Sequence, residues 1–230
     1  MLHLAAADLL SLWERAGARS AHERALELLG LALPDEAPEE RAVLDLGLRD
    51  WHLLRLRAEL FGYELPCYGD CPHCGERLDI TLDARAYVRE SLPHAREFVD
   101  RAGSRWRLPN TLDLIAAACS AGPDEAERVL YERCRVGGGT PDRATFTEVD
   151  AGLALIARER AFELELTCAE CAGKWTLTFD PASFLWEELN AQALTLLDEV
   201  HRLALHYGWS ERDILALSEQ RRRAYLARLQ

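Results

Sequence analysis

The sequence predicts an α+β protein that is mainly helical, with a central antiparallel β unit like a zinc ribbon. Helix-type spacing of apolar residues dominates both ends of the chain, 1–62 and 181–230. Between them, two short runs of alternating apolar residues each follow a Cys-x2-Cys pair. Two such pairs are the usual sequence form of a four-thiolate metal site, so we expect two hairpins to meet at one ion.

The N-terminal region, 1–62, is expected to be helical throughout. Ser20 followed by Glu23 has the form of a capping box, which predicts a helix start there. A later helical segment is expected to break at Gly47 and to end before Gly62. The arginines interleaved with its apolar residues are expected to face solvent; they are Arg49, Arg55 and Arg57.

The middle region, 63–180, is expected to be the β core with an insertion, 84–160, between its two halves. Strand periodicity follows each cysteine pair, at 77–82 and at 175–179. The insertion is expected to hold a hairpin with its turn at 101–104 and three helices. These helices are expected to start at Asn110 or Thr111, to run from Pro123 to Cys134, and to cover 149–157.

The C-terminal region, 181–230, begins with the longest predicted helix, from Asp180 as N-cap to Gly208. Its apolar residues recur at steps of three and four, which is typical of a core face; any exposed part would bind a partner helix. With the residues that follow, the candidate partner surface comprises Trp186, Leu189, Leu196, Val200, Leu203, Tyr207, Trp209, Arg221, Arg222 and Arg223. The three regions are expected to form one integrated domain.

The predicted ligands of one structural Zn²⁺ ion are Cys71, Cys74, Cys168 and Cys171. Four thiolates close the coordination shell and leave no position for a water, so the ion would be structural and not hydrolytic. The side chain of His73, inside the first motif, is expected to point away from the metal. The spacing leaves open whether Cys67 is a further ligand or a bystander.

A Cys-Pro-His-Cys sequence also occurs at the active site of thiol oxidases, where the first Cys lies at a helix N-terminus. A thiol oxidoreductase that uses Cys71 and Cys74 is therefore one alternative. Gly75 and a strand pattern follow this motif, however, and a redox site would leave Cys168 and Cys171 without a role. These observations favour structural zinc.

Composition narrows the classes of function. The 39 acidic and 27 basic residues give a net charge of −12, which opposes binding to nucleic acid and to anionic membranes. The run Arg221 to Arg223 is nevertheless a basic cluster, so a zinc-ribbon adaptor or regulator that contacts nucleic acid through it is the second alternative. No apolar run approaches the roughly 20 residues of a membrane span. The spacing of the seven cysteines suits a metal site better than disulfides, so we expect the protein in the reducing cytoplasm. No catalytic motif is found, so we expect a protein that is not an enzyme.

A series of different short motifs spans nearly the whole chain, and their order resembles that of a known protein family. They are Leu-x-x-Trp-Glu-Arg at 10–15, Arg-Asp-x-x-Leu-Leu-x-Leu-Arg at 49–57, Phe61-Gly62, Cys-Pro-x-Cys-Gly-Glu at 71–76, Leu-Pro-x-x-x-Asp-Leu at 108–114, the second cysteine pair, Trp186 and the run from His201 to Leu226. This order resembles a baseplate-associated family of contractile-tailed phages and phage-like extracellular contractile injection systems.

The resemblance implies a non-enzymatic structural or assembly role in the baseplate. Its partners would be other baseplate or tail proteins. The protein would act at the assembly site in the cytoplasm, or become part of the phage-tail-like particle. Cys67 is not part of the motif pattern that carries the resemblance.

Overall fold

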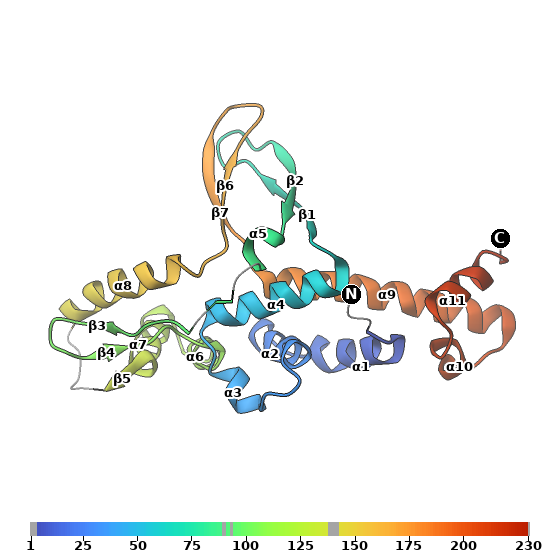
Figure 1. The fold of residues 1–230 in the computed structure, drawn as a ribbon, viewed down its shortest axis with the longest axis horizontal. Coiled ribbons are helices and arrows are strands. Elements are labelled where there is room, and N and C mark those ends of the chain that lie inside the picture. The colour runs from blue at the N-terminus through green and yellow to red at the C-terminus, as the bar shows by residue number, and fades with distance from the viewer. Residues whose placement is uncertain (1–3, 89–90, 93, 138–142, 230) are drawn as a thin grey trace.

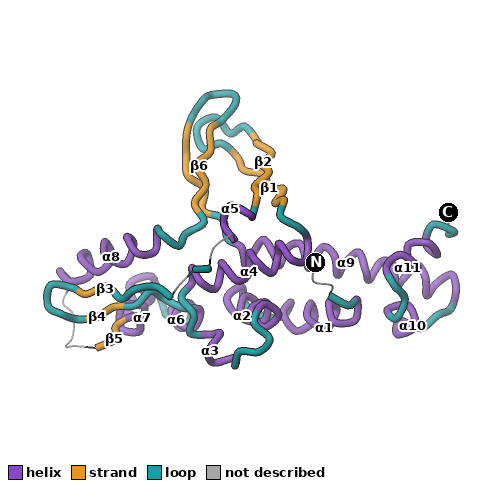
Figure 2. The backbone as a smooth tube through the Cα atoms, in the orientation of Figure 1, coloured by secondary structure: helices purple, strands orange, loops and turns teal. Residues whose placement is uncertain are grey.

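The computed structural model describes residues 4–88, 91–92, 94–137 and 143–229. Helices form an elongated body, and two β-hairpins project from it (Figure 1). A smaller group of helices and short strands lies at one end, and the C-terminal helices lie at the other. Strands make up a small part of the chain (Figure 2), which confirms the predicted α+β class in which helices dominate.

The helices are α1 (Ala6–Gly17), α2 (Ala21–Ala32), α3 (Pro38–Ala42), α4 (Leu46–Phe61), α5 (Arg85–Val88), α6 (Thr111–Ala118), α7 (Pro123–Cys134), α8 (Arg143–Arg158), α9 (Pro181–Tyr207), α10 (Glu211–Leu215) and α11 (Glu219–Leu226). The strands are β1 (Glu64–Asp70), β2 (Arg77–Asp83), β3 (Phe98–Val99), β4 (Arg105–Trp106), β5 (Arg135–Gly137), β6 (Glu163–Thr167) and β7 (Lys174–Thr178). Among the described residues they form two antiparallel pairs, β1-β2 and β6-β7, and one three-stranded sheet, β3-β4-β5.

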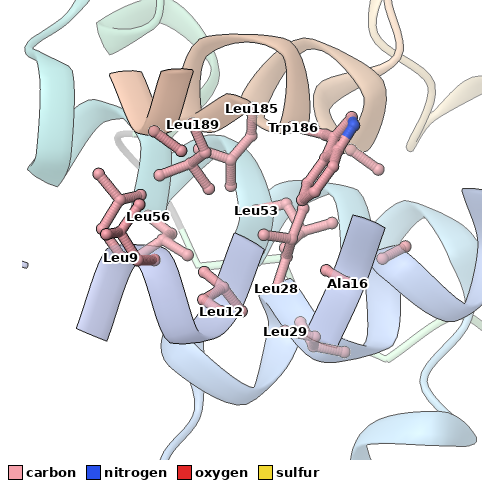
Figure 3. Close-up of a cluster of buried hydrophobic side chains, with 14 of the residues drawn as sticks. Leu9, Leu12, Ala16, Leu28, Leu29, Leu53, Leu56, Leu185, Trp186 and Leu189 are labelled. Carbon is pink, nitrogen blue, oxygen red and sulfur yellow. The ribbon is translucent and has the colours of Figure 1, made fainter. Parts of the chain in front are cut away.

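The main hydrophobic core lies where α1, α2 and α4 pack against the first half of α9 (Figure 3). Leu28, Leu53 and Leu185, from α2, α4 and α9, are each fully buried there. Residues from the two ends of the chain therefore share one core. The predicted N-terminal and C-terminal helical regions are not separate packing units.

Half of the candidate partner surface is part of the protein's own core, which corrects that prediction. The first half of α9 packs against α1, α2 and α4, and its second half packs against α10 and α11. The chain thus covers the apolar stripe by itself. The stripe residues that are buried in this way are Trp186, Leu189, Leu196, Val200 and Leu203.

The break before α4 lies at 43–45 and not at Gly47, which is inside the helix. Asp45 caps α4 by accepting a hydrogen bond from the Leu48 N–H at 3.1 Å, and it also pairs with Arg160 at 2.9 Å. A Cβ atom at position 47 would lie 2.6 Å from the Cβ of Arg160. Gly47 is therefore required by the close approach of Arg160, and it does not break the helix.

Two of the three α4 arginines are buried, so the predicted solvent face is wrong for them. Arg57 is 3% exposed and Arg49 is 7% exposed, whereas Arg55 lies on the surface as expected. Arg57 forms two hydrogen bonds to the carboxylate of Glu188 on α9, at 2.6 and 2.8 Å. A buried guanidinium needs such partners, and sequence spacing on α4 alone cannot reveal a partner on α9.

The insertion has a small core of its own around Trp106, Tyr131 and Val149. The predicted hairpin and its turn are confirmed, and β5 adds a third strand that the sequence reading missed. Asn110 is the N-cap of α6 and forms a full capping box with Asp113. Helix α8 starts at Arg143, earlier than the predicted 149.

The two long hairpins, here called the projection (64–83 and 163–178), stand out from the body instead of lying at its centre (Figure 2). In all four strands, exposed side chains alternate with less exposed ones. At the base, Leu65 and Phe162 are buried beside α4. Each hairpin is a separate two-stranded sheet, so no strand ladder joins the two.

Candidate metal centre

The four predicted ligands come together at the tip of the projection. The sulfur atoms of Cys71, Cys74, Cys168 and Cys171 all lie within 4.8 Å of one another. The Sγ atoms of Cys71 and Cys171 are 3.7 Å apart, as are those of Cys74 and Cys168. Four cysteines from two distant segments thus form one group that could bind a metal ion.

Cys67 does not belong to this group. It lies on β1 opposite Ile80, and its sulfur is 3.4 Å from the carbonyl oxygen of that residue. Burial raises the pKa of its thiol above the usual value. The question that the spacing left open is therefore answered: the structure brings together the two Cys-x2-Cys pairs without Cys67.

The turn of the first hairpin, residues 71–76, is a compact loop here called the first knuckle. The N–H of Cys71 donates to the carbonyl of Glu76 at 2.8 Å, and the N–H of Gly75 donates to the carbonyl of Cys71 at 2.8 Å. Gly75 has a φ of +77°, which glycine adopts readily. The glycine after the cysteine pair therefore permits the turn that brings both sulfurs to the same side.

The second knuckle, residues 168–173, repeats this geometry. The N–H of Cys168 donates to the carbonyl of Gly173 at 2.9 Å, and the N–H of Ala172 donates to the carbonyl of Cys168 at 3.0 Å. Ala172 takes the place of Gly75 and has a φ of +56°; it is the one described non-glycine residue with positive φ. A side chain in this region costs about 1–2 kcal/mol. The second knuckle is thus the more strained of the two.

His73 connects the two knuckles, although it is not among the four clustered ligands. Its Nε2 atom lies 3.2 Å from the carbonyl oxygen of Lys174. A Cβ atom on Gly173 would lie 2.4 Å from the His73 ring and 3.2 Å from the sulfur of Cys171. Sequence reasoning missed the role of Gly173, because only the second hairpin's position beside His73 creates it.

The electrostatics of the four thiols favour a bound cation. Burial opposes ionisation of Cys71, but the N–H groups of His73 and Cys74 and the neighbouring thiols outweigh it and lower the pKa of Cys71 to about 7. The Glu76 N–H lowers the pKa of Cys74, but burial and the other three sulfurs raise it to about 12. Four thiolates repel one another at these distances, and a divalent cation removes that repulsion.

The remaining candidate partner residues lie at the far end of α9, away from the metal centre (Figure 1). Tyr207 stacks on Trp209 with ring centroids 4.7 Å apart, and both contact the ring of Tyr225. Arg222 is predicted to lie on the partner surface, but it is 7% exposed and pairs with Glu199 at 2.9 Å, so that prediction is wrong for this residue. The triple-arginine run alternates between core and surface because successive helix positions face different directions.

Comparisons of the chain with protein-family models, with curated proteins and with solved structures find no match in any of the three. In the described part of the chain, no helix combines the length and the apolar character that crossing a membrane requires.

Proposed function

We propose that this protein is a non-enzymatic structural or assembly protein of the baseplate of a contractile tail or injection system, that zinc stabilises its projection, and that it acts through protein–protein contacts. The observation that carries the structural role is the four-cysteine group, which joins two otherwise separate hairpins at their tips. The order of motifs along the chain supports the baseplate assignment. In this proposal the protein works with other baseplate or tail proteins at the cytoplasmic assembly site.

The sulfur positions support zinc as the metal. A tetrahedral ion with Zn–S bonds of about 2.3 Å separates its ligand sulfurs by about 3.8 Å. The two contacts between the hairpins are 3.7 Å, well beyond the roughly 2.05 Å of a disulfide. Two hairpins that each offer a Cys-x2-Cys knuckle to one ion form the zinc-ribbon-like unit of this proposal. Its role is structural because four thiolates fill the shell.

The gain from metal binding follows from the packing of the projection. The alternating strands leave most projection side chains exposed or only half-buried, so little hydrophobic burial holds the hairpins together. The ion cross-links segments about a hundred residues apart in sequence and supplies free energy of folding. We infer that the zinc keeps the projection closed so that it can present its surface to a partner.

Metal analysis of the purified chain tests the zinc assignment. We expect one zinc per chain, with loss of the zinc in Cys71→Ser and in Cys168→Ser. Cys119→Ser is the matched control, because Cys119 is an exposed cysteine outside the four-sulfur group. A wild-type chain that folds fully without metal would refute the assignment, and so would Cys71→Ser and Cys168→Ser variants that keep their zinc.

A complementation experiment tests the baseplate role. The injection-system gene cluster would be expressed with the wild-type gene, without the gene, and with the Cys71→Ser gene, and particles would be counted by electron microscopy. We expect complete particles to depend on the gene, with the Cys71→Ser chain restoring few of them. Normal particles without the gene would refute the baseplate role and leave the zinc assignment untouched.

The adaptor alternative receives less support than the sequence suggested. Its basic cluster is reduced because Arg222 turns inward to Glu199 and Arg223 pairs with Glu219. The thiol oxidoreductase alternative requires Cys71 at a helix N-terminus, whereas Cys71 directly follows β1 and is 2% exposed. Salt-sensitive retention of the protein on nucleic acid would favour the adaptor. Turnover in a disulfide-reduction assay would favour the thiol oxidoreductase.

A further inference from the structure

The four sulfurs are arranged so that the sulfur of each exposed cysteine contacts the sulfur of a buried cysteine of the other hairpin. Cys74 is exposed and its sulfur is 3.7 Å from that of Cys168, which is 1% exposed. Cys171 is exposed and its sulfur is 3.7 Å from that of Cys71, which is 2% exposed. These contacts are close to the van der Waals separation of two sulfur atoms, and a disulfide requires each pair to approach by about 1.7 Å more.

We propose that this centre is also an oxidation site, at which a hydroperoxide converts the four thiols into disulfides that join the hairpins, Cys74 to Cys168 and Cys71 to Cys171. The inference rests on the cysteine geometry and goes beyond the structural role of the metal. It does not depend on the baseplate assignment.

Each disulfide forms in two balanced steps. The sulfur of Cys74, after losing its proton, attacks one peroxide oxygen; an S–O bond forms, the O–O bond breaks, and the other oxygen leaves as an alcohol or as water after taking a proton. The sulfur of Cys168 then attacks the sulfenic sulfur; an S–S bond forms, the S–O bond breaks, and hydroxide leaves and is protonated to water. Two electrons pass from the sulfurs to the peroxide, and a bound metal ion loses two of its ligands.

The oxidised centre would keep the projection closed. A disulfide between Cys74 and Cys168, or between Cys71 and Cys171, joins the same two hairpins that the metal joins. A disulfide inside one knuckle, such as Cys71 to Cys74, would also release the metal, but it would leave the hairpins unconnected at their tips. The contacts between hairpins therefore determine whether oxidation preserves or opens this part of the molecule.

Peptide mapping of the oxidised protein tests the proposal. The chain with Cys67→Ser, purified with its metal, would be treated with hydrogen peroxide, blocked with a thiol reagent, and digested with trypsin without reduction. Released metal would be measured with a chromogenic indicator. We expect the tryptic peptide 58–77 to be disulfide-linked to peptide 161–174, with one metal ion released per chain and with reversal by dithiothreitol.

Two other outcomes would overturn the proposal. One is a set of disulfides confined to each peptide; the other is sulfinic or sulfonic acid at the four sites without any disulfide. Exposed Cys119 is the internal control for general thiol reactivity.

A pair of metal-free variants gives a second measurement. Cys74→Ser/Cys168→Ser keeps the Cys71–Cys171 contact, and Cys168→Ser/Cys171→Ser keeps only the first knuckle's pair. We expect the first variant to form its disulfide about tenfold faster than the second. Equal rates would count against the proposal, and the mapping on the metal-loaded chain decides the matter if either variant fails to fold.

Discussion

The ring of His73, in the first knuckle, contacts the second hairpin at the carbonyl oxygen of Lys174, with Nε2 and the oxygen 3.2 Å apart. The contact joins the knuckle of one hairpin to the first residue of β7 in the other. It is possible because Gly173 has no side chain where the ring lies. The two knuckles therefore fit together through a histidine and a glycine as well as through the four sulfurs.

Gly173→Ala should weaken the metal centre. The added methyl group would overlap the His73 ring, displace it from Lys174 and press on the sulfur of Cys171. We expect the metal affinity to fall about tenfold, the usual effect of disturbing groups that support a ligand. Competition with a zinc chelator measures the change. In a Gly173→Ala/His73→Ala double variant part of the loss should be recovered; no recovery would show that the clash with His73 is unimportant.

Ala172→Gly should stabilise the protein. Ala172 has a φ of +56° in the second knuckle, where the first knuckle has Gly75 at +77°. Glycine removes the steric cost of this conformation, at some entropic cost, so we expect a net gain of about 0.5–1 kcal/mol in unfolding free energy. Gly75→Ala should cost about 1 kcal/mol. Ala169→Gly, in the same knuckle but without positive φ, is the control and should give no gain in chemical denaturation.

Arg57→Ala should be strongly destabilising. Arg57 donates to the carboxylate of Glu188 and to the carbonyl oxygens of Gly62 and Glu64, so it connects α4, the start of β1 and α9. Removing it leaves several partly buried acceptors without a donor and a cavity where the buried guanidinium lay, at a cost of about 3 kcal/mol in urea denaturation. The matched control is Arg55→Ala, which breaks an exposed pair with Glu59 and should cost no more than about 0.5 kcal/mol. Equal effects would contradict this account of the buried pair.

Asp50 should make stability depend on pH. Burial raises the pKa of Asp50 from 3.8 to about 6; Arg49 opposes the shift, and Asp180 and Asp45 add to it. The folded chain therefore binds this proton more tightly than the unfolded chain. The resulting stability is present below pH 3.8 and is lost as the pH rises through about 6.

The Asp50→Asn variant removes this loss. Relative to wild type, its unfolding free energy should increase between pH 4 and pH 7, by up to about 3 kcal/mol, and then stay constant. Denaturation at a series of pH values measures the difference, with Asp198→Asn as the control for removing an exposed carboxylate on α9. A difference that does not change over this pH range would show that the pKa of Asp50 is not raised.

Local signals were enough to predict most elements of the described chain. Ser20 caps α2 with its box to Glu23, Asp180 caps α9, and Gly208 in a left-handed conformation ends α9. The two cysteine pairs also predicted the four-sulfur group, because two Cys-x2-Cys pairs are the usual sequence form of a four-thiolate site. These features depend on neighbours in sequence, and such neighbours can be read directly.

Only the tertiary structure decided which surfaces are buried and where the β unit lies. The apolar stripe of α9 reads equally well as a core face or a partner surface, and it is a core face because α1, α2, α4, α10 and α11 cover it. The helical spacing predicts Arg57 on the surface, but the tertiary structure buries it beside Glu188. No sequence pattern indicates that position 173 requires glycine, because the requirement comes from the His73 ring of the other hairpin. Each outcome depends on contacts between residues far apart in sequence, and no local pattern contains them.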